Sequence, residues 1–162
     1  MSNRTPADFY RADGYCANES VGYLMRRVLL AITQDTDKRL EPHGLTHAQW
    51  GPLFFLRKSG SATVAELARE LQTDPGAMTR MLDRLEAKGL CRRVRSVSDR
   101  RVVNIELTDE GSAAAQQVPE VLCQVQNEYL AGFDTDEWNQ LKSYLHRILD
   151  NTQAFAAQAA KK

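Results

Sequence analysis

The chain has 162 residues, which is enough for one or two small folded units and too few for a large enzyme. Its 21 Lys and Arg residues balance 21 Asp and Glu residues, and 43% of the residues are hydrophobic, as in an ordinary globular protein. No apolar run approaches the roughly 18 residues that a membrane-spanning helix needs, so no such helix is expected.

The sequence lacks the residue patterns that catalysis or metal binding would need. Cysteine and histidine are scarce, and none falls in a metal-binding spacing: Cys16, Cys91, Cys123, His43, His47 and His146. No glycine-rich phosphate loop and no Gly-x-Ser-x-Gly turn occurs. We therefore expect no enzyme activity, no cofactor and no metal. Residues 1–6 lack the apolar stretch of a secretory signal, so the cytoplasm is the expected compartment.

Two helices are expected in the first third of the chain. Apolar residues recur at helical spacing over residues 20–40, after which a proline and a glycine end the helix. Thr46 and Gln49 form the capping-box pattern that opens a second helix, through about residue 58. Residues 59–62 are expected to form a loop.

The next two helices form a helix-turn-helix pattern. Thr63 and Glu66 are a second capping box, which starts a short helix to about residue 71. Asp74 as N-cap and Pro75 as first residue then start the helix that would be the recognition helix, residues 74–88. Its buried stripe is expected to comprise Ala77, Met78, Met81, Leu82 and Leu85, and its exposed face Gly76, Thr79, Arg80, Asp83 and Arg84.

A β-hairpin follows. Residues 90–95 and 102–107 alternate enough to form two strands, joined by a loop over residues 96–101. Further helices are expected from residue 108 to about 131 and from residue 134 onward. The predicted fold class is mainly α with a small β wing: a winged helix-turn-helix unit flanked by long helices.

Positive charge is concentrated on the recognition helix and the hairpin. Residues 75–101 contain eight Lys or Arg and three acidic residues, a net charge of +5 in a chain whose total is zero, so the remainder carries −5. A basic helix beside a basic ribbon fits the major groove of duplex DNA and the minor groove next to it. The segment is therefore predicted to bind double-stranded DNA.

The sequence divides into three parts on this interpretation: residues 1–45 (N-terminal helix, dimerisation), 46–107 (winged helix-turn-helix, DNA binding) and 108–162 (C-terminal helices, dimerisation). The flanking helices have apolar faces that their own parts do not cover. A two-fold dimer would bury these faces and set two recognition helices about 34 Å apart, one turn of DNA. The alternative is a monomer in which the flanking helices pack only on each other.

Residues 83–111, with their Asp99-Arg100-Arg101 hairpin tip, and Gly-Leu-Thr-x-x-Gln-Trp at residues 44–50 resemble the MarR family of bacterial transcriptional regulators. The order of the expected elements matches as well, so the resemblance covers nearly the whole chain. It implies a homodimer that binds a pseudo-palindromic operator, usually as a repressor. It also implies release from DNA by a small phenolic or aromatic-acid ligand.

In MarR-like proteins the wing arginine enters the minor groove while the aspartate of the same motif holds it. The resemblance assigns these roles to Arg101 and Asp99, and a paired hydrogen bond from the guanidinium to the carboxylate is expected. The predicted DNA-binding residues are Gly76, Thr79, Arg80, Arg84, Arg95, Asp99, Arg100 and Arg101. Arg92 and Arg93 are expected, with Arg95, to hold the wing on phosphates. The alternative is a solvated hairpin tip that carries charge for solubility.

A ligand pocket is implied between the first helix, the second helix and the recognition unit. Its candidate residues are Tyr23, Arg26, Arg27, His47 and Trp50. Aromatic walls and an arginine would suit an aromatic carboxylate. For Trp50, plain core packing is an equally good interpretation, and one of the two arginines is expected to face solvent.

Two alternatives to a ligand-released repressor remain. The first is a thiol redox switch at Cys16, although the reactive cysteine of peroxide-sensing relatives aligns near residue 22; Cys91 is expected to be buried in a strand and Cys123 to lie at a helix interface. The second, from another class, is a winged-helix module that binds protein or RNA.

Overall fold

The computed structural model describes residues 5–96 and 99–159. Three stretches lie outside the described residues: 1–4, 97–98 and 160–162. They contain the start of the expected N-terminal dimerisation segment, the middle of the expected hairpin loop and the end of the expected C-terminal dimerisation segment. The chain divides into two compact units, Arg26–Gln126 and a second unit formed by Met1–Met25 with Asn127–Lys162. No helix in the described part of the chain is long and apolar enough to cross a membrane.

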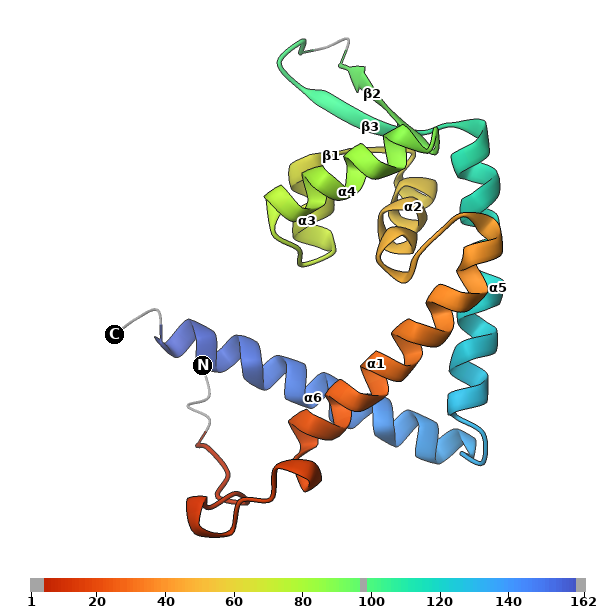
Figure 1. Cartoon of the computed structure of the whole chain (residues 1–162). Coiled ribbons are helices and arrows are strands. Elements are labelled where there is room, and N and C mark those ends of the chain that lie inside the picture. Colours follow the sequence, from red (N-terminus) through yellow and green to blue (C-terminus); the bar gives the residue numbers. More distant parts are fainter. Residues whose placement is uncertain (1–4, 97–98, 160–162) are drawn as a thin grey trace. The chain divides into compact units, whose positions relative to one another are not determined.

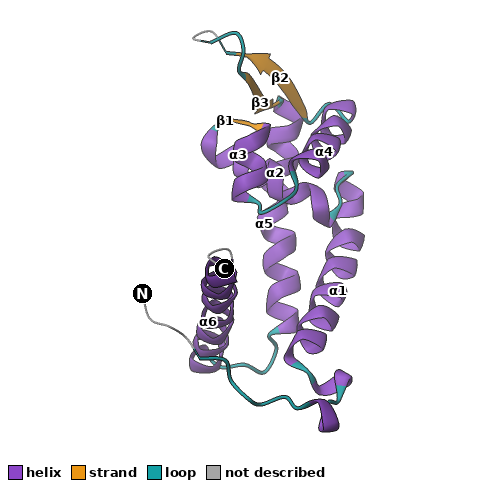
Figure 2. Ribbon diagram, turned by 90° about the vertical axis from the view of Figure 1, so that its left-hand side faces the viewer, coloured by secondary structure: helices purple, strands orange, loops and turns teal. Residues whose placement is uncertain are grey.

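The unit Arg26–Gln126 contains a winged helix-turn-helix (Figures 1 and 2). The unit begins with most of α1 (Val21–Leu40) and a short 3-10 helix, η3 (Glu41–His43). These are followed by α2 (His47–Ser59), β1 (Ser61–Thr63), α3 (Val64–Glu70) and the recognition helix α4 (Pro75–Ala87). The remaining elements are β2 (Cys91–Arg95), β3 (Val103–Leu107) and α5 (Asp109–Tyr129). The ribbon formed by β2 and β3 extends beyond the helices of this unit (Figure 1). The expected fold class, mainly α with a small β wing, is confirmed.

The sheet has three strands rather than the two expected. Its order is β1-β3-β2, and all pairs are antiparallel, with Ala62 opposite Ile105 and Arg93 opposite Ile105 on the other side. The expected loop at residues 59–62 is therefore wrong except at Gly60, since Ser59 ends α2 and Ser61 begins β1. Three residues are too few to show an alternating pattern, and β1 exists only because β3 supplies its hydrogen-bond partners.

Local signals set the helix ends as expected. The Asp74 carboxylate accepts a hydrogen bond from the Ala77 backbone N–H at 2.9 Å, and the Thr63 hydroxyl accepts one from the Glu66 N–H at 3.2 Å. Gly89 has φ of 71°, the left-handed conformation that commonly ends a helix. These contacts satisfy backbone groups that a helix leaves unpaired at its ends.

The core of this unit orients the recognition helix. Met78, Leu82 and Leu85 are 3%, 0% and 0% exposed, and they pack in one cluster with residues of α2, α3, β3 and α5. The rest of the expected buried stripe, Ala77 and Met81, is half-buried. Burial of this stripe leaves the opposite, charged face of α4 in solvent.

The second unit has no comparable core. It contains two 3-10 turns, η1 (Ala12–Gly14) and η2 (Ala17–Glu19), the start of α1, and α6 (Thr135–Ala159). None of the apolar side chains described in this unit is buried. Its exposed large apolar residues are Phe9, Tyr10, Tyr15, Val21, Leu24, Met25, Tyr129, Phe133, Trp138, Tyr144, Leu145, Leu149 and Phe155.

A tight junction joins the winged helix to α5. The Thr108 hydroxyl donates to the Gly89 carbonyl at 2.6 Å and accepts from the Gly111 N–H at 3.0 Å, and the Thr108 N–H donates to the Leu90 carbonyl at 3.2 Å. The first turn of α5 therefore lies against the residues that follow α4. A Cβ atom on Gly111 would lie 1.7 Å from the Leu90 carbonyl oxygen, so no larger residue fits without movement of the backbone.

We expect Gly111→Ala to destabilise the protein by about 1–3 kcal/mol, the usual cost of overpacking. Denaturant unfolding followed by circular dichroism would measure this change. Gly22→Ala is the matched control, because no heavy atom lies within 4 Å of a Cβ there and alanine favours the helix. Equal stability of Gly111→Ala and the wild type would contradict the close approach.

Candidate nucleic-acid interface

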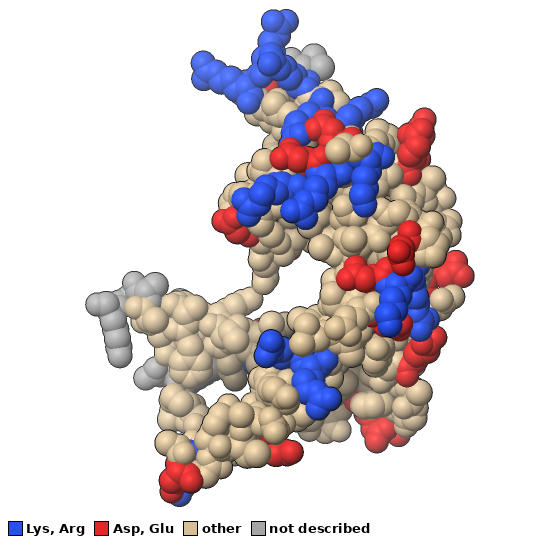
Figure 3. Space-filling view, viewed as in Figure 1, with Lys and Arg blue, Asp and Glu red and all other residues tan. Residues whose placement is uncertain are grey.

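All eight residues predicted to bind DNA are exposed in the winged-helix unit. Basic atoms gather over the recognition helix and the ribbon, with acidic atoms between them (Figure 3). Arg80 and Arg84 come from α4, Arg95 is the last residue of β2, and Arg100 and Arg101 lie in the turn that precedes β3. None of these five arginines has an ion-pair partner among the described residues, so their guanidinium groups are available to an anion.

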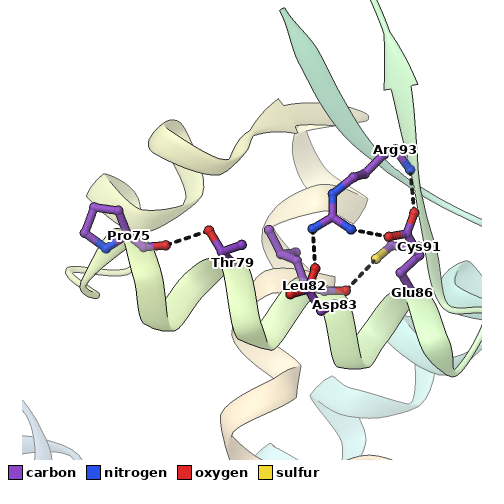
Figure 4. A network of polar contacts seen from close by, with 7 residues as sticks. All are labelled: Pro75, Thr79, Leu82, Asp83, Glu86, Cys91 and Arg93. Atoms are coloured by element: carbon purple, nitrogen blue, oxygen red, sulfur yellow. Dashed lines mark hydrogen bonds and ion pairs between the residues drawn. The ribbon is translucent and has the colours of Figure 1, made fainter.

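The N-terminal turn of α4 is more constrained than its exposure indicates. The Thr79 hydroxyl donates to the Pro75 carbonyl at 2.9 Å (Figure 4), so its proton is used within the helix and its methyl group and lone pairs remain. A thymine methyl therefore suits Thr79 better than a phosphate, which needs a donor. A Cβ on Gly76 would lie 3.1 Å from the Asp74 carboxylate and 3.6 Å from the Arg80 guanidinium. Glycine keeps this space open.

The carboxylate at the wing tip binds backbone rather than the arginine side chain. Asp99 Oδ1 accepts from the Arg101 backbone N–H at 2.9 Å, and the Asp99 carbonyl accepts from the Val102 N–H at 2.9 Å. The expected paired hydrogen bond to the Arg101 guanidinium is not among the contacts of the described residues. The reason is distance along the chain: an aspartate reaches a backbone N–H two residues on, in a turn, more readily than the end of an arginine. Asp99 thus fixes the backbone from which Arg101 projects.

Two ribbon arginines expected on phosphates are ion-paired within the protein. Arg92 Nη2 lies 3.1 Å from Glu106 Oε2 across the β2–β3 pair. Arg93 Nη2 lies 2.6 Å from Asp83 Oδ1, and its Nη1 donates to Glu86 (Figure 4). The hydrogen bond that the Arg93 guanidinium donates to Asp83 is the main cause that raises the pKa of Arg93 above its usual value. Sequence reasoning missed the Arg93 contacts because both acids lie on another element.

Lys88 also has a structural partner. Its Nζ donates to the Gly44 carbonyl at 2.7 Å and to Gln49 Oε1 at 3.0 Å. Gln49 Oε1 in turn accepts from the Thr46 N–H at 3.1 Å. This lysine therefore ties the end of the recognition helix to the start of α2, and its charge is partly committed there.

The structure places the five expected ligand residues in different surroundings. The winged-helix unit has an open hollow of about 530 Å³, lined by Thr33, Asp37, Lys38, Glu41, Leu45, Thr46, His47 and Ala48. Of the five candidates only His47 lines it. Arg26 and Arg27 are exposed and lie at least one and a half helical turns before Thr33, and Tyr23 belongs to the other unit. Trp50 packs edge-to-face with His47 and Phe54, at ring-centroid distances of 6.2 and 6.3 Å, which favours its packing interpretation.

The thiols differ in environment. Cys91 is buried with its Sγ 3.8 Å from the Leu82 carbonyl oxygen, and burial raises its pKa to about 11. Its expected position as a buried strand residue is confirmed, and it is a poor thiolate nucleophile near neutral pH. Cys16 is exposed, and so is Cys123, which was expected at a helix interface. Within the described ranges no three His, Cys, Asp or Glu residues are grouped as a metal site.

The fold and the basic surface define a winged helix-turn-helix regulator, and comparison with known proteins gives its family. The model of the MarR family matches residues 45–103. The multiple antibiotic resistance protein MarR of Salmonella typhimurium is 34% identical over 128 residues, which cover 76% of this chain and 89% of that protein. The repressor MdtR of Bacillus subtilis is 43% identical over 79 residues, about half of each protein (49% and 51%). The chain belongs to the MarR family of transcriptional regulators.

Solved structures agree with this assignment. A mutant of MarR from Escherichia coli, complexed with operator DNA, matches with a TM-score of 0.74 and 32% sequence identity. The match covers 82% of this chain and 96% of that one.

Proposed function

We propose that this MarR-type regulator is a repressor that binds a pseudo-palindromic operator as a homodimer and is released by a small phenol or aromatic acid. The observation that carries DNA binding is the set of five exposed arginines on α4 and the hairpin that have no ion-pair partner among the described residues. Binding to a bacterial chromosome would place the protein in the cytoplasm. Repression is supported by the names of relatives such as MdtR.

The two elements would divide the contacts with DNA. Arg80 and Arg84, on the exposed face of α4, can read guanine bidentately in the major groove, and the Thr79 methyl can contact thymine. Arg101, on a backbone turn fixed by Asp99, would enter the adjacent minor groove, where a narrow A·T-rich groove attracts arginine. Arg95 and Arg100 would contact phosphates.

We expect Arg101→Ala to weaken operator binding by about 1–3 kcal/mol, roughly 5- to 150-fold in Kd, because a minor-groove contact is lost. The probe is the duplex that the wild-type protein selects from a random-sequence library, titrated by fluorescence anisotropy. Wild-type binding to this duplex should fall steeply with salt, as expected for several phosphate contacts.

The control is Arg27→Ala, which removes the same charge from an exposed position on α1, outside the DNA-binding elements. An unchanged Kd for Arg101→Ala would remove Arg101 from the interface. Failure of the wild type to prefer any duplex over random sequence would overturn operator binding altogether.

A homodimer is supported by the apolar side chains of the second unit. Thirteen large apolar residues there are exposed and none of its described apolar residues is buried, so this unit lacks the core that would hold it together alone. A second copy of the chain would cover these faces by a two-fold interface. Such an interface would also supply a second recognition helix for the other half of the operator.

Sedimentation should show two copies of the wild-type chain per particle. Leu149→Glu, which puts a charge on an exposed apolar position of α6, should shift the particle toward one copy and weaken operator binding. Ser143→Glu adds the same charge at an exposed polar position on a different face of α6 and should leave the dimer intact. A monomeric wild type would refute the dimer.

The hollow beside α2 is the proposed ligand site. The His47 backbone N–H donates to Asp37 Oδ1 at 2.6 Å, while the buried His47 Nδ1 has no hydrogen-bond partner among the described residues. A ligand hydroxyl could bond this nitrogen, and Lys38 at the same hollow could pair with a carboxylate. Glu41, which also lines the hollow, would disfavour a carboxylate placed near it.

Hydroxybenzoates should raise the melting temperature of the wild type and release the selected duplex, because a ligand that binds the folded state stabilises it. Lys38→Met should reduce the shift for hydroxybenzoates more than for neutral phenols. Lys58→Met, an exposed position outside the hollow, is the control. The absence of any shift across both ligand classes would count against an aromatic effector.

A further inference from the structure

Arg93 joins the wing to the recognition helix through two carboxylates (Figure 4). Its guanidinium donates to Asp83 Oδ1 at 2.6 Å and to Glu86 Oε2, and the Arg93 backbone N–H donates to Glu86 Oε1 at 3.1 Å. Glu86 therefore holds both the backbone and the side chain of the same strand residue. Asp83 and Glu86 are three positions apart on α4, so they lie side by side on one face of the helix.

Three residues on one face of β2 have different surroundings. Cys91, Arg93 and Arg95 are two positions apart and point to the same side of the strand. Cys91 is buried with its Sγ near the Leu82 carbonyl of α4, Arg93 pairs with the acids of α4, and Arg95 is exposed and unpaired within the described residues. The strand therefore contacts the recognition helix through its first and third residues.

Electrostatics gives no reason for this cluster in a DNA-binding surface. One arginine and two carboxylates carry a net charge of −1, and they belong to the ribbon and the recognition helix, over which basic atoms gather with acidic atoms between them (Figure 3). Negative charge beside a polyanion disfavours binding. A benefit to DNA binding must therefore come from geometry, since a fixed angle between helix and ribbon lets both enter their grooves without an entropic cost of ordering.

We propose that Arg93 is a positioning residue that does not contact DNA: by its pairing with Asp83 and Glu86 it holds the wing at a fixed angle to the recognition helix, so that both elements bind the operator as one rigid unit. This inference builds on the proposed operator binding. The two acids share the role, because each holds one arm of the guanidinium.

The proposal predicts an effect opposite to that of charge alone. Glu86→Gln removes a negative charge from the DNA-facing helix, which by charge should strengthen binding to every duplex. If positioning dominates, Glu86→Gln should weaken binding to the selected operator by about 5-fold or more, the scale of coupled contacts, while binding to random duplex is unchanged or tighter. Arg93→Lys, which keeps the charge but cannot bridge two carboxylates in a fork, should weaken operator binding as well.

The salt dependence separates positioning from phosphate contact. For Arg93→Lys and Arg93→Met, the slope of log Kd against log salt on the selected operator should equal that of the wild type. Arg95→Ala, which removes an arginine proposed to contact phosphate, should lower that slope by about one. Glu120→Gln removes an exposed acid from α5, outside the cluster, and should leave the operator Kd unchanged.

Folding is checked independently of DNA. Far-ultraviolet circular dichroism and the unfolding midpoint identify any variant that fails to fold, and the proposal is judged on the folded ones. In the free protein, hydrogen exchange of the Arg93 N–H, bonded to Glu86, should be faster in Glu86→Ala than in Glu120→Gln.

Three outcomes overturn the inference. A wild type that prefers an operator, combined with Glu86→Gln binding that operator as tightly as or tighter than the wild type, refutes the positioning role and leaves the proposed function standing. A reduced salt slope for Arg93→Met would make Arg93 a phosphate contact instead. Failure of the wild type to prefer any duplex overturns the proposed function, and the positioning role with it.

Discussion

Burial of the apolar stripe of α4 is the constraint on which the DNA-binding surface depends. Leu82 and Leu85 are fully buried in the core, and residues of α2, α3 and β3 surround them. In a helix with 3.6 residues per turn, fixing one face fixes the opposite face as well. The arginines of α4 consequently face solvent, because the burial of the opposite face sets the orientation of the helix.

The basic residues of this surface fall into two groups that composition alone cannot separate. Arg92, Arg93 and Lys88 bind groups within the protein, whereas the five arginines named above have no ion-pair partner in the described part of the chain. The first group is partly shielded by its partners, so it offers less attraction to an external anion. The surface available to DNA therefore contains fewer basic side chains than the charge count of residues 75–101 indicates.

The two units differ in how they are stabilised. The winged-helix unit has a core of its own, extended by the Thr108–Gly111 junction to the start of α5. The unit that contains α6 leaves its large apolar residues exposed in a single chain. Apolar surface of this extent is characteristic of protein interfaces. In the proposed dimer, the winged-helix unit would bind the operator and the unit that contains α6 would form the contact between the two copies of the chain.

The sequence by itself determined the elements whose signals are local. Helix caps such as Asp74 and Thr63 act over three residues, and the stripe of α4 and the strands of the wing show their periodicity within a short window. Tertiary structure alone decided the third strand, the partners of Arg93 and Lys88, and the lining of the hollow beside α2. Each of these joins residues of different elements, so it depends on how the elements pack. Asp99 is an instructive exception: its motif was evident in the sequence, but whether its carboxylate held a side chain or the backbone was a matter of geometry that residue types do not encode.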